Sequence, residues 1–278
     1  MRRPLFEHGI FLIPKVQGFA VYSALWLVSL LATSITQSRQ GLLIPVSLQL
    51  MVVAGFPLAF SWAQRLTALS IFKSKGFSWR NALLSGLASL CLIFLLDEIE
   101  VLQSYVIPET MEVGRQTQAL VKAASTSHLF GLLISLALVP SLCEEFCFRG
   151  FLFDRFLQDG SISQSILITS AMFGFFHQDP SRFLVAAVAG CVLATLVVRT
   201  GSLYPAIVTH FGVNAGGILL LNNPLRNFVP WTEGNQQVPA WLVVLSLLGI
   251  SAVFKGLKKE EGFRQNPSLE GKSEQSRT

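Results

Sequence analysis

The stretch Leu129–Phe151 reads LFGLLISLALVPSLCEEFCFRGF, and it places two adjacent carboxylates and an arginine at the end of an apolar run. The part of this stretch before Ser141 carries no charge. A charged side chain inside hydrocarbon costs at least ~2.5 kcal/mol, so it usually marks a functional site. The stretch therefore predicts a membrane helix that carries a polar site formed by Glu144, Glu145 and Arg149.

The composition of the whole chain is typical of a membrane protein. Of its 278 residues, 51% are hydrophobic and only 13% are charged, whereas soluble domains carry about 25% charged residues. The mean hydropathy is +0.55. The apolar residues occur in blocks of about 20, the length needed to cross ~30 Å of hydrocarbon. We therefore expect an all-α fold, a polytopic transmembrane helical bundle.

About eight segments are apolar enough to be transmembrane spans. They are Val16–Thr33, Leu42–Trp62, Asn81–Leu96, Ser127–Phe156, Ile162–His177, Phe183–Val198, Leu203–Leu221 and Val238–Phe254. With the N-terminus inside, most of the 21 Lys and Arg residues fall on inner segments, as the positive-inside rule requires. We expect an integral multi-pass membrane protein with cytoplasmic N- and C-termini. The net charge of +5 then reflects topology and indicates no nucleic-acid partner.

The chain divides into four regions by composition. These are an N-terminal membrane region at 1–126 with three spans and an amphipathic loop, a polar-motif core at 127–222, a loop and last span at 223–254, and a polar cytoplasmic tail at 255–278. The first span is longer than the core of a signal peptide, so we interpret it as an uncleaved anchor. The tail has the composition of a disordered segment.

Three polar clusters with helical spacing lie in the region 127–222. They are Glu144-Glu145-x-x-x-Arg149, Phe173-x-x-x-His177 and His210-x-x-x-Asn214. Residues four apart share one face of a helix, so Glu145 and Arg149 can pair and lower the cost of both charges. Glu144 is rotated by about 100° from its neighbour and faces a different direction.

The three clusters can meet at one site. Counted at ~1.5 Å per residue from the inner ends of their helices, they lie at compatible depths in the inner half of the bilayer. A helix over Ser127–Phe156 would be ~45 Å long, longer than the hydrocarbon is thick, so it must tilt, bend or project. Pro140 is the expected bend, because proline removes a backbone hydrogen bond and clashes with the preceding turn.

These residue types indicate hydrolysis of an acyl bond by activated water. A glutamate in an apolar environment can act as a general base on water, and a nearby histidine can orient that water or shuttle a proton. A second histidine with an asparagine offers donors for a developing oxyanion. No Ser-His-Asp arrangement is evident. Cys143 and Cys147 flank the glutamates; a metal role is open for them, but they fit better as small apolar helix residues.

The three motifs, in this order on successive helices, resemble those of the CPBP intramembrane proteases. That family includes CAAX prenyl endopeptidases of the Ras-converting type and bacterial Abi or bacteriocin-processing relatives. The resemblance covers 127–222, about a third of the chain, and no motif position departs from the family pattern. The resemblance implies that Glu144 is the base that activates water and that His177 assists it. It also implies that Glu145 and Arg149 form a structural pair, that His210 and Asn214 stabilise the oxyanion, and that Phe173 is a packing residue.

The resemblance leaves the cofactor open. Glu144, His177 and His210 could supply three zinc ligands and leave a fourth position for water, as in a metalloprotease. However, the chain has no HExxH motif and each histidine stands alone on its helix, which favours a mechanism that requires no cofactor.

The function expected from the motifs is that of an intramembrane endopeptidase. It would resemble a CAAX-type prenyl endopeptidase and act on a membrane-bound or lipidated peptide. The alternative is a non-catalytic membrane scaffold or a bacteriocin-immunity-type protein with the same polar core. A transporter would require paired inverted halves, and the N-terminal half contains no counterpart of the motifs.

Overall fold

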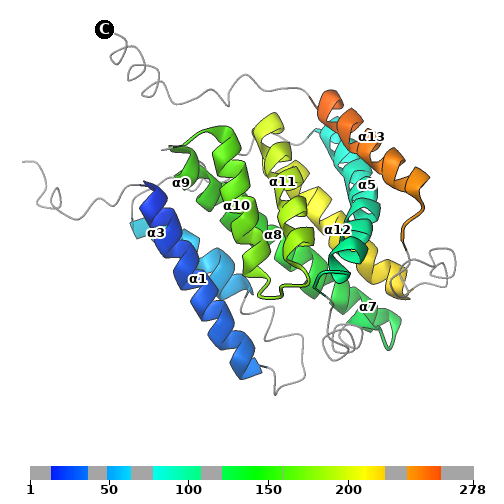
Figure 1. Cartoon of the computed structure of the whole chain (residues 1–278). Helices are drawn as coiled ribbons and strands as arrows, with labels where there is room; N and C mark the ends of the chain where they lie inside the picture. The colour runs from blue at the N-terminus through cyan, green and yellow to red at the C-terminus, as the bar shows by residue number, and fades with distance from the viewer. Residues whose placement is uncertain are drawn as a thin grey trace, which may run out of the picture.

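The computed structural model describes residues 14–36, 49–63, 78–107, 121–158, 160–222 and 237–257, and all regular secondary structure in these ranges is helical (Figure 1). The elements are α1 (Pro14–Thr36), η1 (Gln49–Ala54), α3 (Gly55–Ala63), α5 (Trp79–Ser104), α7 (Thr126–Leu132), η2 (Leu133–Leu138), α8 (Val139–Glu145), η3 (Phe146–Leu152), α9 (Phe153–Gln158), α10 (Ile162–Phe176), α11 (Phe183–Thr200), α12 (Tyr204–Asn222) and α13 (Ala240–Gly256). The predicted all-α membrane bundle is confirmed.

Four helices in the described ranges are long and apolar enough to cross a membrane. They are Trp79–Ser104, Thr126–Gln158, Phe183–Thr200 and Tyr204–Asn222. The apolar helices α10 and α13 are shorter. The count of eight spans stays a prediction, because a third of the expected second span lies outside the described residues. Half of the expected amphipathic loop and nearly all of the polar tail lie outside them too.

The central helix runs from Thr126 to Gln158 over 33 residues and contains two π-helical segments, η2 and η3. Its N-terminus is capped by Ser125, whose side chain accepts from the backbone N–H of His128. Pro140 is one of the first two residues of α8, directly after η2. The irregularity expected at Pro140 therefore takes the form of a wider π turn just before the proline, a common cause of distortion in long helices.

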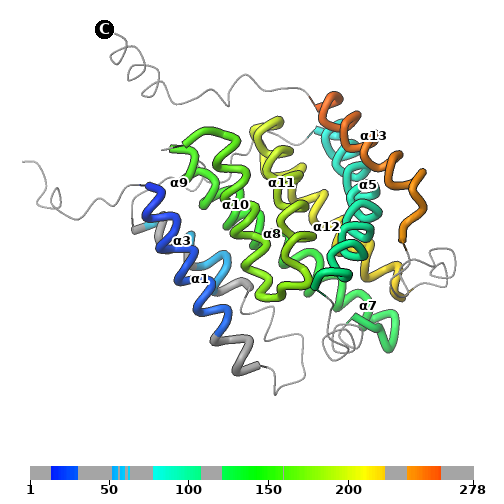
Figure 2. Tube along the Cα trace, viewed as in Figure 1, coloured from blue at the N-terminus to red at the C-terminus, as the bar shows by residue number. Residues whose placement is uncertain are grey.

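Of the remaining helices, α1, α10 and α12 pack directly against this central helix. Figures 1 and 2 show α10 and α11 side by side, and α5 contacts both α12 and α13, while α1 lies against α9. The contact between α5 and α12 is close because both helices present small residues. Ser89 Oγ donates to the carbonyl of Thr209, and a Cβ added at Gly212 would collide with the Ser89 side chain. Small residues at such a crossing let two membrane helices approach and hydrogen-bond.

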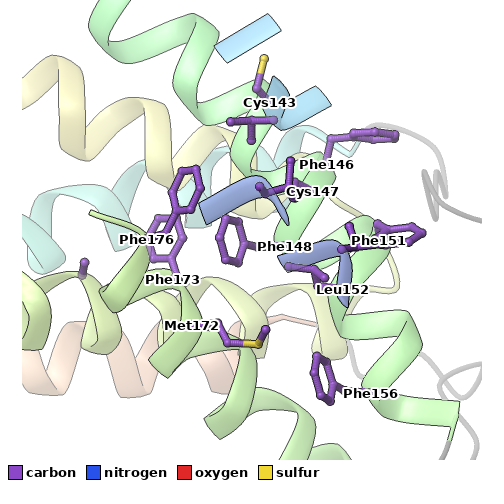
Figure 3. Packing of buried hydrophobic residues seen from close by; sticks show 14 residues of the cluster. Cys143, Phe146, Cys147, Phe148, Phe151, Leu152, Phe156, Met172, Phe173 and Phe176 are labelled. Carbon is purple, nitrogen blue, oxygen red and sulfur yellow. The ribbon is translucent and has the colours of Figure 1, made fainter. Parts of the chain in front are cut away.

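An aromatic cluster fixes α10 against the central helix (Figure 3). Phe148 of η3 lies at its centre, with ring centroids 5.0 Å from Phe173 and 5.4 Å from Phe176, both edge-on. Edge-to-face pairs at these distances add to the stabilisation that comes from burial. The cluster places the helix that carries the glutamates next to the helix that ends at His177.

Candidate active site

Glu145 lies at the centre of the polar site and is fully buried, with 0% of its surface exposed. Its Oε1 accepts a hydrogen bond of 2.8 Å from Arg149 Nη1, so the ion pair that the spacing predicts is present. The same oxygen lies 2.8 Å from His210 Nδ1. This second contact joins the first motif to the third and was not predicted, because sequence spacing says nothing about neighbours on another helix.

Glu144 approaches the other nitrogen of the same imidazole. Its Oε2 lies 3.9 Å from His210 Nε2, farther than a direct hydrogen bond. The hydrogen bond at Nδ1 holds the plane of the ring, so Nε2 faces Glu144. His210 therefore sits between the two glutamates and is bonded to only one of them.

Arg149 is buried as deeply as its partner, with 1% of its surface exposed. Besides Glu145, it donates from Nη2 to the carbonyl of Gly190 at 3.3 Å, and its guanidinium carbon lies 4.3 Å from the centre of the Phe173 ring. A buried cation is tolerated only where such partners replace water. The Gly190 carbonyl comes close because α11 crosses α10 at Ser170, where a Cβ on Gly190 would lie 3.1 Å from Ser170 Cα.

Phe173 separates the two histidines and contacts both. Its ring lies edge-on at 5.0 Å from the His177 ring and at 5.8 Å from the His210 ring. His177 is the residue at which α10 ends, its side chain is exposed, and its Nδ1 lies 2.9 Å from the carbonyl oxygen of Phe173. The structure thus links His177 to the glutamate cluster through the Phe173 ring.

Asn214 is half-buried, and its Nδ2 donates to the carbonyl of Leu136 at 3.4 Å. In a regular α-helix this carbonyl would accept from the residue four positions later, but that residue is Pro140, which has no N–H. Asn214 therefore supplies a donor where the proline removes one. The resemblance assigns Asn214 to an oxyanion-stabilising pair with His210; here the two side chains have different partners.

Metal binding has no prepared ligand set in the described part of the chain. No group of three or more His, Cys, Asp and Glu residues there is arranged to hold a metal ion. Glu144 and His210 approach each other, but His177 does not join them in such a group. Cys143 and Cys147 are buried free thiols within the aromatic cluster, as expected of small apolar helix residues.

Comparison with known proteins finds a family model that matches the part of the chain that carries this site. Residues 126–216 match the family model described as "Type II CAAX prenyl endopeptidase Rce1-like". The matched segment contains the central helix, α10, α11 and most of α12, and with them every residue of the three motifs. Over these residues the chain resembles the CPBP family that the motifs suggest, and we refer to residues 126–216 as the CPBP core. The predicted core at 127–222 has nearly the same bounds.

The chain is also similar to a curated protein. The chain is 27% identical over 129 residues to "Putative membrane peptidase YdiL" of Bacillus subtilis (strain 168), a match that covers 45% of this chain and 52% of the relative. The chain thus spans about half the length of the curated relative it matches. No solved structure matches the chain.

Helices outside the CPBP core hold α10 in place. Tyr22 of α1 donates from its hydroxyl to the carbonyl of Met172 at 2.9 Å, and Trp26 donates from Nε1 to the carbonyl of Phe175 at 3.1 Å. Gln103 of α5 bonds to the loop that follows α10. The sequence alone assigns no role to these residues, because each is of a type that is common at membrane interfaces and its partner lies on another helix.

Proposed function

We propose that the protein is an intramembrane endopeptidase that hydrolyses a peptide bond of a membrane-bound or lipidated substrate with water activated by Glu144. The observation that carries the proposal is the buried cluster of Glu144, Glu145, Arg149 and His210 inside the CPBP core. Four ionisable side chains in the interior of a membrane bundle are costly. A site that performs acid–base chemistry accounts for them.

The proposed mechanism starts with a water molecule beside Glu144. The carboxylate accepts a proton from the water, and the oxygen adds to the carbonyl carbon of the scissile bond. The negative charge then lies on the former carbonyl oxygen, where Asn214 and His210 stabilise it; His210 donates from Nε2 as an imidazolium, since its Nδ1–H is bonded to Glu145. Asn214 has a second N–H besides the one bonded to Leu136, so it can serve both partners.

The intermediate then collapses and the peptide C–N bond breaks. The proton taken up by Glu144 passes to the leaving amine, with His177 as the assisting proton carrier. Glu145 takes no proton in this scheme. It holds Arg149 and the His210 ring in place through its Oε1.

The substrate class follows from the membrane setting and the family. A lipidated peptide of the CAAX type is suggested by the family description, and an unmodified membrane peptide is suggested by the name of the curated relative. The proposed topology keeps both termini in the cytoplasm, so the glutamates would act in the inner half of the bilayer.

A non-catalytic scaffold is the second candidate. It is favoured by the structural bonds that the motif residues already make: Glu145 with Arg149, and Asn214 with the Leu136 carbonyl. In that case the polar cluster would serve to fix helix packing, and neutralising Glu144 would leave function intact.

Cleavage by purified protein in detergent distinguishes the two candidates. The substrates are a fluorogenic lipidated CAAX peptide and an unmodified membrane peptide, each with and without a chelator. We expect Glu144→Gln and His177→Ala to lower the rate by about 100-fold or more, in the range typical of lost acid–base catalysis. Asp154→Asn is the matched control, because Asp154 is a carboxylate of the same long helix paired with Arg155 away from the cluster.

The outcomes separate the parts of the proposal. Activity that persists in Glu144→Gln would remove the assigned base. Activity lost on chelation would replace the metal-free scheme with a zinc-dependent one. If the wild-type protein cuts neither peptide, the substrate class fails first and the scaffold gains support.

A further inference from the structure

Gln103 lies in the last turn of α5, outside the CPBP core, and only 7% of its surface is exposed. Both ends of its amide are bonded to backbone groups of a different part of the chain. Nε2 donates to the carbonyl of Pro180 at 2.9 Å, and Oε1 accepts from the N–H of Leu184 at 2.9 Å. A buried glutamine with both amide ends bonded to backbone is a specific clamp, since either group left unpaired would be costly.

The two bonds of Gln103 fix the connection between α10 and α11. The N–H of Leu184 belongs to the first turn of α11 and has no acceptor within its own helix. Arg182, at the N-cap of α11, pairs with Asp179 through its side chain and provides no capping hydrogen bond to the helix. Gln103 therefore caps α11 from another helix, and at the same time its N–H group holds the loop at Pro180.

This loop begins at His177. It is short and internally bonded: Gln178 adopts a left-handed backbone with φ 56, and Asp179 Oδ1 accepts from the backbone N–H of Ser181 at 2.9 Å. A non-glycine residue in that conformation is held there by its surroundings. With so few residues between His177 and Pro180, a displacement of Pro180 is passed on to the end of α10.

The other side of the same helix end is held by α1. Trp26 donates to the carbonyl of Phe175, and the Gln178 side chain donates to the carbonyl of Trp26 at 3.4 Å. The His177 ring is exposed and makes its own hydrogen-bond contact with a backbone carbonyl of α10. Its position therefore follows the position of the helix end, which is held by Trp26 of α1 and by Gln103 of α5. Figure 1 shows α1 and α5 on opposite sides of α10.

We infer that Gln103 is a positioning residue for His177, acting through its paired hydrogen bonds to Pro180 and Leu184. The inference rests on the proposed function, because it gives the N-terminal helices the task of aligning the assisting histidine with the glutamate cluster. Gln103 lies outside residues 126–216, which match the family model, and would act on the site from there.

The first test measures the histidine itself and needs no substrate. The chain has 4 histidines, so protein labelled with ¹³C at imidazole Cε1 gives few ring signals, and each is assigned by substitution. In Gln103→Met, which keeps the side-chain length but removes both bonds, we expect the His177 signal to shift or broaden while the His210 signal stays in place. An unchanged His177 signal in folded Gln103→Met would overturn the inference.

Asn222→Leu is the matched control. The Asn222 amide is also a clamp between separate segments, since Oδ1 accepts from the N–H of Ala123 at 2.7 Å and Nδ2 donates to the carbonyl of Val121 at 2.8 Å. It joins the end of α12 to the residues before α7 and does not contact the α10–α11 loop. We expect a comparable loss of thermal stability with no change in the His177 signal.

Kinetics then separate positioning from general destabilisation. We expect Gln103→Met to lower kcat about tenfold with KM changed less than twofold, because misplaced catalytic groups slow the chemical step more than they weaken binding. Gln103→Asn keeps both amide groups on a side chain one methylene shorter, so its effect should be intermediate; it also serves if Gln103→Met does not fold. An equal loss of kcat in Asn222→Leu would contradict the inference.

The two proposals fail in different ways. A wild-type protein that cleaves neither peptide, with a His177 signal that still moves in Gln103→Met, would leave Gln103 as the residue that positions His177 and remove the protease function. Cleavage by the wild-type protein, with a His177 signal that does not change in Gln103→Met, would keep the protease function and remove the positioning role of Gln103.

Discussion

Glu145 and His210 are 65 positions apart in the sequence and meet at 2.8 Å, on the same carboxylate oxygen that accepts from Arg149. The other oxygen of Glu145 is buried and has no hydrogen-bond partner among the residues that the structure describes. One oxygen atom therefore ties the central helix to α12. The position of the His210 ring therefore depends on both the charge and the shape of the Glu145 side chain.

Glu145→Gln tests this dependence. The substitution preserves size and removes the negative charge, so Arg149 is left as a buried cation without its carboxylate. Breaking a buried pair in this way costs about 3–5 kcal/mol, and we expect a loss of that order in unfolding experiments in detergent. Asp154→Asn breaks the partly exposed pair with Arg155 and should cost less than about 1 kcal/mol. Equal costs for the two variants would contradict the central role of Glu145.

His177→Ala and His210→Ala should separate catalysis from stability. His177 is exposed at the end of α10, so its loss should leave the unfolding temperature nearly unchanged while cleavage falls. His210 is buried and bonded to Glu145, so its loss should lower both stability and cleavage. Loss of a bond to a charged group corresponds to about 1.5–3 kcal/mol. Thermal unfolding and peptide cleavage, measured on the same preparations, check both expectations.

Phe173→Leu tests the aromatic contact that joins the two histidines. The Phe173 ring lies 4.3 Å from the Arg149 guanidinium carbon and edge-on to both imidazoles. Leucine fills much of the space but loses the cation–π contact, which corresponds to about 2 kcal/mol where it is desolvated. We expect lower stability and lower kcat.

Phe176→Leu is the control for that change, because Phe176 is buried on the same helix and packs on Phe148. It should lower stability with little change in kcat. If both variants lower kcat to the same extent, the Phe173 ring has no special part in the site.

Local spacing predicted those features of the site that depend on a single helix. The i,i+4 relation of Glu145 and Arg149 was enough to predict their ion pair. The absence of an N–H on Pro140 was enough to locate an irregularity in the central helix. The order of the three motifs was enough to suggest the CPBP family, which the family model supports over 126–216.

Contacts between helices could not be predicted in the same way. Helical periodicity says which residues share a face but not which helix that face meets, and in a membrane the outer faces are as apolar as the core. The bond from Glu145 to His210 and the clamp from Gln103 to Pro180 are of this kind. Each needs the arrangement of the bundle, and neither has a signature in the sequence.

Asn214 lies opposite the carbonyl that Pro140 leaves without its usual donor, so variants at these two positions can separate a structural role of Asn214 from a catalytic one. Asn214 donates to the Leu136 carbonyl, the group to which Pro140 cannot donate. Asn214→Ala should therefore cost about 1 kcal/mol of stability, the usual net value of one hydrogen bond. In a Pro140→Ala background the backbone N–H is restored, so the same substitution should cost less.

Double-mutant analysis of unfolding measures the difference between the two backgrounds. Asn222→Ala is the control, since its bonds lie at the other end of α12, to Val121 and Ala123, and its cost should be the same with or without the proline. Cleavage rates complete the argument. An oxyanion donor is needed whatever stands at position 140, so Asn214→Ala should lower the rate equally in both backgrounds. If Pro140→Ala rescues the rate as well as the stability, Asn214 acts on the helix alone, and His210 is left to stabilise the oxyanion without it.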